Sequence, residues 1–254
     1  MSFLELLKIE FMKVKRSKIL PILFVAPLLI VISGAGSIAG YMEDMADYVW
    51  QAMFVQGGLL FGYYLLPFSI IVICTLVSGR ERQNKGVLKM LSLPVDRGRI
   101  AMAKFIVQLC YVGLEILIYF LCFVFVGVIA THFMGISDAL PILYISKWST
   151  LLFLTAIPLT ALVWAITVIF GKPVISVGLN FLLVIPSILV ANTPLWILYP
   201  YSYSGYIVTM ELDRLSRDAE RLNFDILPFI LCALVILMGC IVISNNQFGK
   251  KEMK

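Results

Sequence analysis

The chain has 254 residues, of which 61% are hydrophobic and only 14% are charged, whereas soluble domains carry about 25% charged residues. A mean hydropathy of +0.98 excludes a water-soluble enzyme, a disulfide-bonded secreted scaffold and a disordered regulator, because apolar residues at this density need lipid as their solvent. The net charge of +5 is modest for a membrane protein, and we expect membrane lipids and no nucleic acid as partners.

The N-terminal segment, residues 1–18, is charged throughout and is not followed by a small-residue cleavage site, so we expect the first apolar run to stay in the membrane. Its apolar residues recur at spacings of four, four and three, at Phe3, Leu7, Phe11 and Val14. This pattern predicts an amphipathic helix in the membrane interface. A basic flank that only fixes the topology is the alternative interpretation.

Apolar stretches of about 20 residues predict the membrane spans. They indicate an all-α polytopic membrane protein, folded as a single membrane domain over residues 1–254. A glycine-lysine-proline stop at residues 171–173 predicts a tight helical hairpin between the fourth and fifth spans. The six predicted spans cover about 19–40, 57–78, 105–131, 148–170, 174–193 and 226–244.

The distribution of Lys and Arg between the loops predicts the orientation, because these residues collect on the cytoplasmic side. With six spans, sixteen Lys and Arg lie on the side of the two termini and four on the other side. We therefore expect both termini and the loop 79–104 to be cytoplasmic, and the chain to cross a bacterial cytoplasmic membrane several times.

The loop 79–104 is longer than a simple connection between spans requires. Val87, Leu88 and Leu91 predict a short amphipathic helix, bounded by Gly86 and Pro94. Its apolar side would face the ends of the membrane helices or a partner protein. A helix in this position could convert a push from outside into a tilt of the two adjoining spans.

This loop resembles that of the permease subunits of ATP-binding-cassette exporters of the second type. Those permeases have an N-terminal interfacial helix and a cytoplasmic coupling helix between spans two and three. The loop shares an acidic-basic pair, a glycine, two leucines, a Leu-x-Pro and a basic end, although Val87 stands where the family usually has threonine or serine. The matching residues are Glu81, Arg82, Gly86, Leu88, Leu91, Leu93, Pro94, Arg97, Arg99 and Lys104.

The resemblance implies that the coupling helix docks on a separate ABC ATPase subunit, which binds the ATP and magnesium. The chain itself has no phosphate-binding loop, so we expect it to bind no cofactor and to be a transport subunit rather than an enzyme. The resemblance also implies a dimer with an identical or related permease. The residues that would couple to the ATPase are Glu81, Arg82, Gly86, Val87, Leu88, Leu91 and Pro94.

The size and layout of the chain resemble those of permeases that protect cells against lantibiotics and bacitracin. Their substrates are amphipathic antimicrobial peptides, which such exporters remove from the membrane as a form of immunity or antibiotic resistance. This resemblance predicts an exporter that expels an amphipathic or hydrophobic substrate.

The extracytoplasmic loop 195–225 begins with aromatic residues and continues as a charged segment with i, i+3 and i, i+4 pairs. This composition is typical of an interfacial aromatic belt followed by a solvated surface helix. The family resemblance implies instead short outer helices that shape the substrate exit. The candidate exit residues are Trp196, Tyr199, Tyr201 and Tyr203.

Glu115 lies about ten residues into the third predicted span, and an ionisable residue at that depth is a candidate for function. It could carry protons or contact a cationic substrate, or it could be a protonated carboxyl bonded between helices. An ion-coupled secondary transporter or channel that uses Glu115 is the alternative function. His132 is the only histidine, so we predict neither a metal site nor a catalytic residue.

Overall fold

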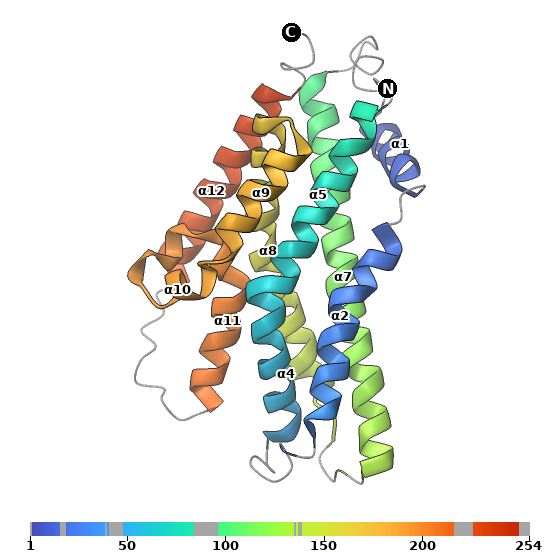
Figure 1. Ribbon diagram of the computed structural model, residues 1–254, viewed down its shortest axis with the longest axis vertical. Coiled ribbons are helices and arrows are strands. Elements are labelled where there is room, and N and C mark those ends of the chain that lie inside the picture. Colours follow the sequence, from blue (N-terminus) through green and yellow to red (C-terminus); the bar gives the residue numbers. More distant parts are fainter. Residues whose placement is uncertain are drawn as a thin grey trace.

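The structure, a computed structural model, describes residues 2–15, 19–38, 40, 48–83, 96–134, 136, 139–215 and 226–248. Within these ranges every regular element is helical (Figure 1), as predicted. The helices form an elongated bundle. We call the end that carries α1 (Phe3–Lys15) and the C-terminal end of α12 (Ile226–Gln247) the terminal end, and the other the opposite end.

Within the part of the chain that the structure describes, five helical stretches are long and apolar enough to cross a membrane, so the chain is a multi-pass membrane protein. They correspond to predicted spans one, two, three, four and six, and several extend beyond the predicted bounds. The second stretch consists of three helical segments in direct succession, in which the middle one is a π-helix. The five are α2 (Ile19–Gly36), α4 (Val49–Leu60) with η2 (Phe61–Leu65) and α5 (Leu66–Gln83), α7 (Arg97–Met134), α8 (Ile142–Phe170) and α12.

The predicted hairpin between the fourth and fifth spans is present. Helix α8 ends at Phe170, and Gly171 takes the left-handed backbone conformation, with φ 71°, that favours glycine. Helix α9 (Pro173–Val184) then begins with Pro173 at its first position, where the missing N–H costs no hydrogen bond.

The predicted fifth span, 174–193, is not one helix. Helix α9 has 12 residues, about 18 Å at 1.5 Å per residue, which is shorter than the hydrocarbon core of about 30 Å. The helix stops before Pro186, because a proline inside a helix removes a hydrogen bond and clashes with the preceding turn. The chain continues as α10 (Ser187–Ala191) and the 3-10 helix η3 (Pro194–Leu198). The count of six complete spans is therefore not confirmed.

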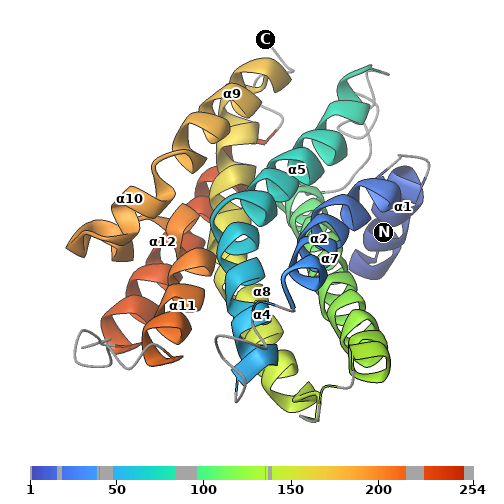
Figure 2. The ribbon, with the colours of Figure 1, turned by 60° about the horizontal axis from the view of Figure 1, so that its bottom comes forward.

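The segment predicted as an extracytoplasmic loop contains a buried helix, α11 (Pro200–Leu215). It runs from the middle of the bundle towards the opposite end and packs against α4, η2 and α8 (Figures 1 and 2). Tyr201 and Tyr203 are almost completely buried, at 1% and 0% exposure. This differs from the expected exposed belt and solvated helix, because the small residues of α11 allow close packing. Residues 216–225 lie outside the described part.

The close contact between α11 and the second span depends on two glycines. A Cβ atom on Gly62, within η2, would lie 2.8 Å from the Ser204 backbone oxygen and 2.9 Å from the Gly205 Cα atom. A Cβ atom on Gly205 would lie 2.3 Å from the Tyr63 ring. Only glycine at these positions lets the two backbones approach so closely.

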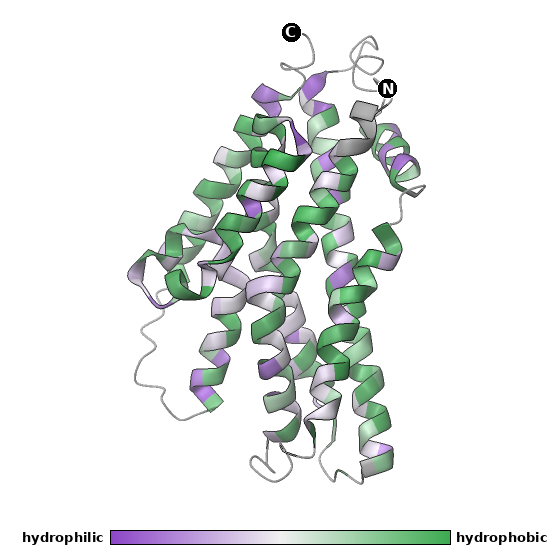
Figure 3. Cartoon of the chain, in the orientation of Figure 1, coloured by the Kyte–Doolittle hydropathy of each residue, from purple (hydrophilic) through white to green (hydrophobic). Residues whose placement is uncertain are grey.

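Most residues along the long helices are hydrophobic (Figure 3), and many large apolar side chains are exposed on the outside of the bundle. Helix α12 is the extreme case, because only 6% of its most hydrophobic window is buried, against 61% for α8. Since α12 packs mainly on α8, most of its surface is available to lipid or to another subunit.

We predict that Gly62→Ala lowers the midpoint of heat-induced unfolding in mild detergent by several degrees. The added methyl meets backbone atoms, which cannot move aside by a change of rotamer, and overpacking of this kind costs about 1–3 kcal/mol. Size-exclusion chromatography of heated samples measures the midpoint.

Gly239→Ala in α12 is the matched control, because its Cβ atom would meet nothing within 4 Å. We expect this variant to unfold at the wild-type temperature or slightly above it, since alanine favours helix. Equal midpoints for Gly62→Ala and Gly239→Ala would contradict the close contact.

Candidate functional site

The residues predicted to contact an ATPase lie at or beyond the edge of the described part of the chain. Helix α5 ends at Gln83, so the backbone of Glu81 and Arg82 belongs to its last turn. Their side chains, and Gly86, Val87, Leu88, Leu91 and Pro94, lie outside the described residues. The end of α5 and the start of α7 both lie at the terminal end of the bundle (Figure 1). The coupling helix itself stays a prediction.

Helix α1 is fixed to α7 by a buried ion pair close to this loop. Lys104 Nζ donates to Glu10 Oε2 at 2.9 Å, and the two side chains are 1% and 3% exposed. Lys13 Nζ donates to the other carboxylate oxygen at 2.7 Å. Lys104 is the eighth residue of α7, counted from Arg97, so α1 is fixed within about two turns of the start of that helix.

The sequence carried a signal for this ion pair that the pattern analysis missed. Leu6, Glu10 and Val14 recur every four residues and are all buried, whereas Phe11 of the predicted apolar face is 37% exposed. A carboxylate within an apolar helix face needs a buried partner. Lys104 alone could be read as the basic end of the loop, because the 94 residues that separate it from Glu10 hide the pairing.

Glu115 lies on α7 and is completely buried, with 0% exposure. Ser69 of α5 is close enough to interact with its carboxyl group, yet among the described residues neither carboxyl oxygen has a hydrogen bond of ordinary geometry. An ionised carboxylate without partners in this environment would cost many kcal/mol. The group is therefore uncharged in this arrangement or takes a partner that the described residues do not supply.

Two further buried polar groups follow the same side of α7. In the described part of the chain, Gln108 Nε2 and the Tyr119 hydroxyl also lack hydrogen-bond partners. Residues 108, 115 and 119 share one helix face because they are seven and four positions apart. The Tyr119 ring stacks on Phe61 of η2 at 4.6 Å, and Gln108 Oε1 accepts a hydrogen bond from Cys74. The π-helical segment and α5 thus cover a polar stripe on α7.

The candidate exit residues Tyr199, Tyr201 and Tyr203 make hydrogen bonds that hold α11 and its entry against α9 and η3. Tyr201 donates to Asn180 Oδ1, and Tyr199 donates to the Leu183 carbonyl oxygen, so both fix α11 and its entry to α9. Tyr203 donates to the Ile197 carbonyl oxygen of η3. Burial raises the pKa of the Tyr201 phenol above its usual value, so the phenol stays protonated and remains a donor.

Trp196 stacks on Tyr206 with ring centroids 3.9 Å apart and is 9% exposed. The four aromatics therefore form one cluster around α9, η3 and α11. Glu115 is not part of it, because α4 and α5 lie between α7 and that cluster (Figures 1 and 2). The structure does not bring all the candidate path residues into a single site. Among the described residues, no group of three His, Cys, Asp or Glu could hold a metal ion.

We predict that Lys104→Met strongly destabilises the protein, because it leaves the Glu10 carboxylate buried beside only one remaining cation. Removal of one partner from a buried ion pair costs about 3–5 kcal/mol. Thermal unfolding in mild detergent measures the effect. The double variant Glu10→Leu, Lys104→Met should recover most of the loss, because both charges are then absent.

Lys13→Met is the matched control for this prediction. The Lys13 side chain is 32% exposed, so water already screens its charge and its loss should matter far less. If Lys104→Met and Lys13→Met were equally mild, the buried pair would not hold α1 in place.

Comparison with known proteins supports the architecture. A family model described as ABC-2 family transporter protein matches residues 6–187, which run from α1 through the broken fifth helix and make up more than half of the chain. A comparison with curated proteins finds no match. Proteins of this family are membrane transport components, generally without an ATPase site of their own, and work with an ABC ATPase in general. The matched range contains most of α1, the loop after α5 and the α8–α9 hairpin, and the chain belongs to the ABC-2 transporter family.

Proposed function

We propose that the chain is the permease subunit of an ABC exporter that moves an amphipathic or hydrophobic substrate out of the cell membrane. A separate ATPase supplies the energy. The observation that carries this proposal is the family match across α1, the first four spans and the broken fifth helix. The apolar, lipid-accessible outer surface suits a substrate that arrives from the bilayer.

In this proposal the terminal end of the bundle faces the cytoplasm. The C-terminal end of α5, the N-terminal end of α7, helix α1 and the C-terminal end of α12 all lie there (Figure 1). Sixteen of the twenty Lys and Arg residues belong to the segments predicted for that side, which favours this orientation.

The geometry at the terminal end supports mechanical coupling. Helix α7 is continuous over 38 residues, about 57 Å, and begins at Arg97, within the predicted loop 79–104 and three residues after Pro94 of the predicted coupling helix. A displacement of that loop by an ATPase would tilt α7 as a rod. Because Lys104 of α7 is paired with Glu10 of α1, helix α1 would move with α7. Two such permeases, identical or related, would open a path between them.

For the substrate we propose an amphipathic antimicrobial peptide of the lantibiotic or bacitracin type. The support is the small size of the chain and its layout, in which no large outer domain interrupts the spans. A peptide of this kind partitions into the outer membrane surface, so an exporter can take it laterally from lipid. Trp196, Tyr199, Tyr201 and Tyr203 surround the broken fifth helix, and we propose that this cluster flanks the exit.

Glu115 favours the second candidate function, an ion-coupled transporter or channel. Its carboxyl is buried and, within the described residues, lacks ordinary hydrogen bonds, as a proton-binding group could. Ion-coupled carriers use several polar groups at interrupted helices near the midplane, and the interrupted helix α9–α10 lies on the far side of α5 from Glu115 (Figure 2). We therefore place this function second.

The proposed partner can be tested by purification of the tagged chain from its host in mild detergent. We predict that an ATP-binding subunit accompanies it, in a ratio of one ATPase to one permease. Leu88→Asp with Leu91→Asp should abolish this association, because the predicted apolar face of the coupling helix becomes charged.

The variant Asn84→Asp with Lys89→Gln is the control, since it changes the charge of the same loop by the same amount and keeps both leucines. It should retain the ATPase. Purification of the wild-type chain alone, in a stable and monodisperse form, would contradict the proposal.

We predict that cells expressing the chain with its ATPase tolerate several-fold more lantibiotic or bacitracin than cells with either subunit alone. Glu115→Gln should preserve this protection, because glutamine matches the uncharged carboxyl in size and shape. The minimal inhibitory concentration measures both effects. Loss of protection in Glu115→Gln, with normal amounts of protein in the membrane, would favour the ion-coupled mechanism.

A further inference from the structure

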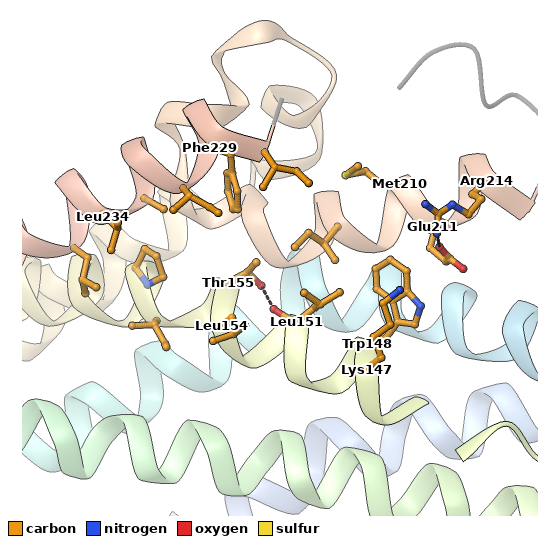
Figure 4. Close-up of a pocket in the computed structure, with 17 residues that line it drawn as sticks. Lys147, Trp148, Leu151, Leu154, Thr155, Met210, Glu211, Arg214, Phe229 and Leu234 are labelled. Carbon is orange, nitrogen blue, oxygen red and sulfur yellow. Dashed lines mark hydrogen bonds and ion pairs between the residues drawn. The ribbon is translucent and has the colours of Figure 1, made fainter. Parts of the chain in front are cut away.

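A groove of about 700 Å³ runs between α8, α11 and α12 (Figure 4). Glu115 does not line it, and its lining residue Phe229 packs against Trp196 and Tyr203 of the aromatic cluster, with ring centroids 5.4 and 4.9 Å apart. Most of its walls are apolar and come from residues such as Leu151, Leu154, Phe229 and Leu234. The α12 side of the groove is open to the membrane, because Ile230 and Leu234 line it and are still 46% and 51% exposed. A molecule in the groove therefore touches lipid.

One end of the groove is polar, and this end lies towards the opposite end of the bundle. Lys147 and Trp148 come from the first turns of α8, and Glu211 and Arg214 come from the last turns of α11 (Figure 4). The Lys147 ammonium lies 5.6 Å from the centre of the Trp148 ring. An amphipathic tryptophan beside a cation is typical of the membrane interface, so this end lies near the headgroups.

The length of the groove matches one leaflet. Its lining extends along α8 from Lys147 to Pro158 and along α12 from Ile226 to Leu237. Eleven helical steps on each helix span about 16 Å, which is about half of the hydrocarbon core of about 30 Å. A single acyl chain that starts at the headgroup level would fill the groove.

The polar end offers more than a positive charge. Glu211 is 6% exposed, and its Oε1 accepts a hydrogen bond from Tyr144 at 3.1 Å. Its Oε2 lies 3.5 Å from the Arg214 guanidinium and, within the described residues, has no hydrogen bond. A buried carboxylate oxygen in this state needs a donor, and a headgroup hydroxyl at the mouth of the groove supplies one.

The charges that line this end favour an anionic ligand. Lys147 and Arg214 contribute two positive charges and Glu211 one negative charge. Asp213 belongs to the same helix but does not line the groove, and its field acts on Tyr63 and Tyr206. The Arg214 side chain is 69% exposed, so N–H groups that do not face Glu211 can reach a headgroup while the ion pair with Glu211 is kept.

We propose that this groove binds an anionic phospholipid with a hydroxylated headgroup, of the phosphatidylglycerol kind. One acyl chain lies between α8, α11 and α12, the phosphate contacts Lys147 and Arg214, and a headgroup hydroxyl donates to Glu211. This proposal requires only that the chain lies in a membrane, and it does not depend on the proposed exporter function.

The test uses the full-length chain, purified in mild detergent with whatever subunit accompanies it. Phosphatidylglycerol is added at defined concentrations, and the lipid retained by each variant is counted by native mass spectrometry. We expect one firmly held phosphatidylglycerol per chain. Retention should be about thirtyfold weaker in Lys147→Ala with Arg214→Ala, because two cations near a membrane surface together contribute about 2 kcal/mol and about 1.4 kcal/mol corresponds to a factor of ten.

Lys8→Ala with Lys172→Ala is the matched control, because it also removes two exposed cations, from the terminal end of the bundle. It should retain the lipid as the wild type does. Ala233→Trp should also release the lipid, because the indole occupies the apolar part of the groove while both cations remain.

Three results would overturn the proposal. Phosphatidylcholine held as firmly as phosphatidylglycerol would contradict an anionic site. Displacement of the lipid by millimolar inorganic phosphate would show that the acyl chain contributes nothing. Equal retention by the wild type and by Lys147→Ala with Arg214→Ala would remove the assigned phosphate contacts. None of these results bears on association with an ATPase, so this test and the test of the exporter are separate.

Discussion

The arrangement of the second half of the chain depends on one constraint: a helix that breaks within a membrane must find hydrogen bonds for its freed backbone groups inside the protein. Lipid offers none, and each unsatisfied group costs several kcal/mol. The break at Pro186 between α9 and α10 is such a place. Tyr199 donates to the Leu183 carbonyl just before it, and Ser187 just after it donates to the Tyr63 carbonyl in η2. Tyr201, in the first turn of α11, adds a bond to Asn180 of α9, so the start of α11 is held against the broken helix.

The same constraint links the break to the π-helical segment of the second span. The Tyr63 carbonyl, within the π segment Phe61–Leu65, accepts the hydrogen bond from Ser187, and π segments inside helices are frequent at functional sites. Gly62 and Gly205 then allow α11 to approach this turn closely. The broken helix, the π turn and α11 therefore form one interdependent unit, in which a change in any member would disturb the other two.

Much of this fold is predictable from the sequence. Five spans follow from hydropathy alone, because runs such as Ile142–Phe170 have no alternative solvent. The hairpin follows from Gly171 and Pro173, whose backbone preferences are local. Local rules also predict the loop after the second span and its flanking cations, which carry the family resemblance.

The parts that escaped prediction depend on contacts between distant segments. A run of Tyr, Ser and Gly at 199–206 has the composition of an interfacial belt, and only the packing of α11 against η2 and α8 shows that it is buried. Hydropathy does not predict the break of the helix at Pro186 within the apolar run 174–193, because it contains no information on backbone geometry. The groove between α8, α11 and α12 could not be predicted at all, since its polar end joins Lys147 to Arg214 across 67 residues of sequence.

The terminal end of the bundle and the polar end of the groove use charged residues in different ways. At the terminal end, Glu10 and Lys104 are buried, so their attraction is weakly screened and fixes α1 to α7. At the opposite end, the Arg214 side chain is 69% exposed and Lys147 lies over the Trp148 ring, so in the proposed site both charges are available to a ligand. Because α7 is continuous between the two levels and α8 packs along it, a tilt imposed at Arg97 would reach the wall of the groove. A lipid held there would favour whichever tilt of the helices lets its acyl chain fit the groove better. Any ligand that binds two conformations with different affinities shifts their equilibrium in this way.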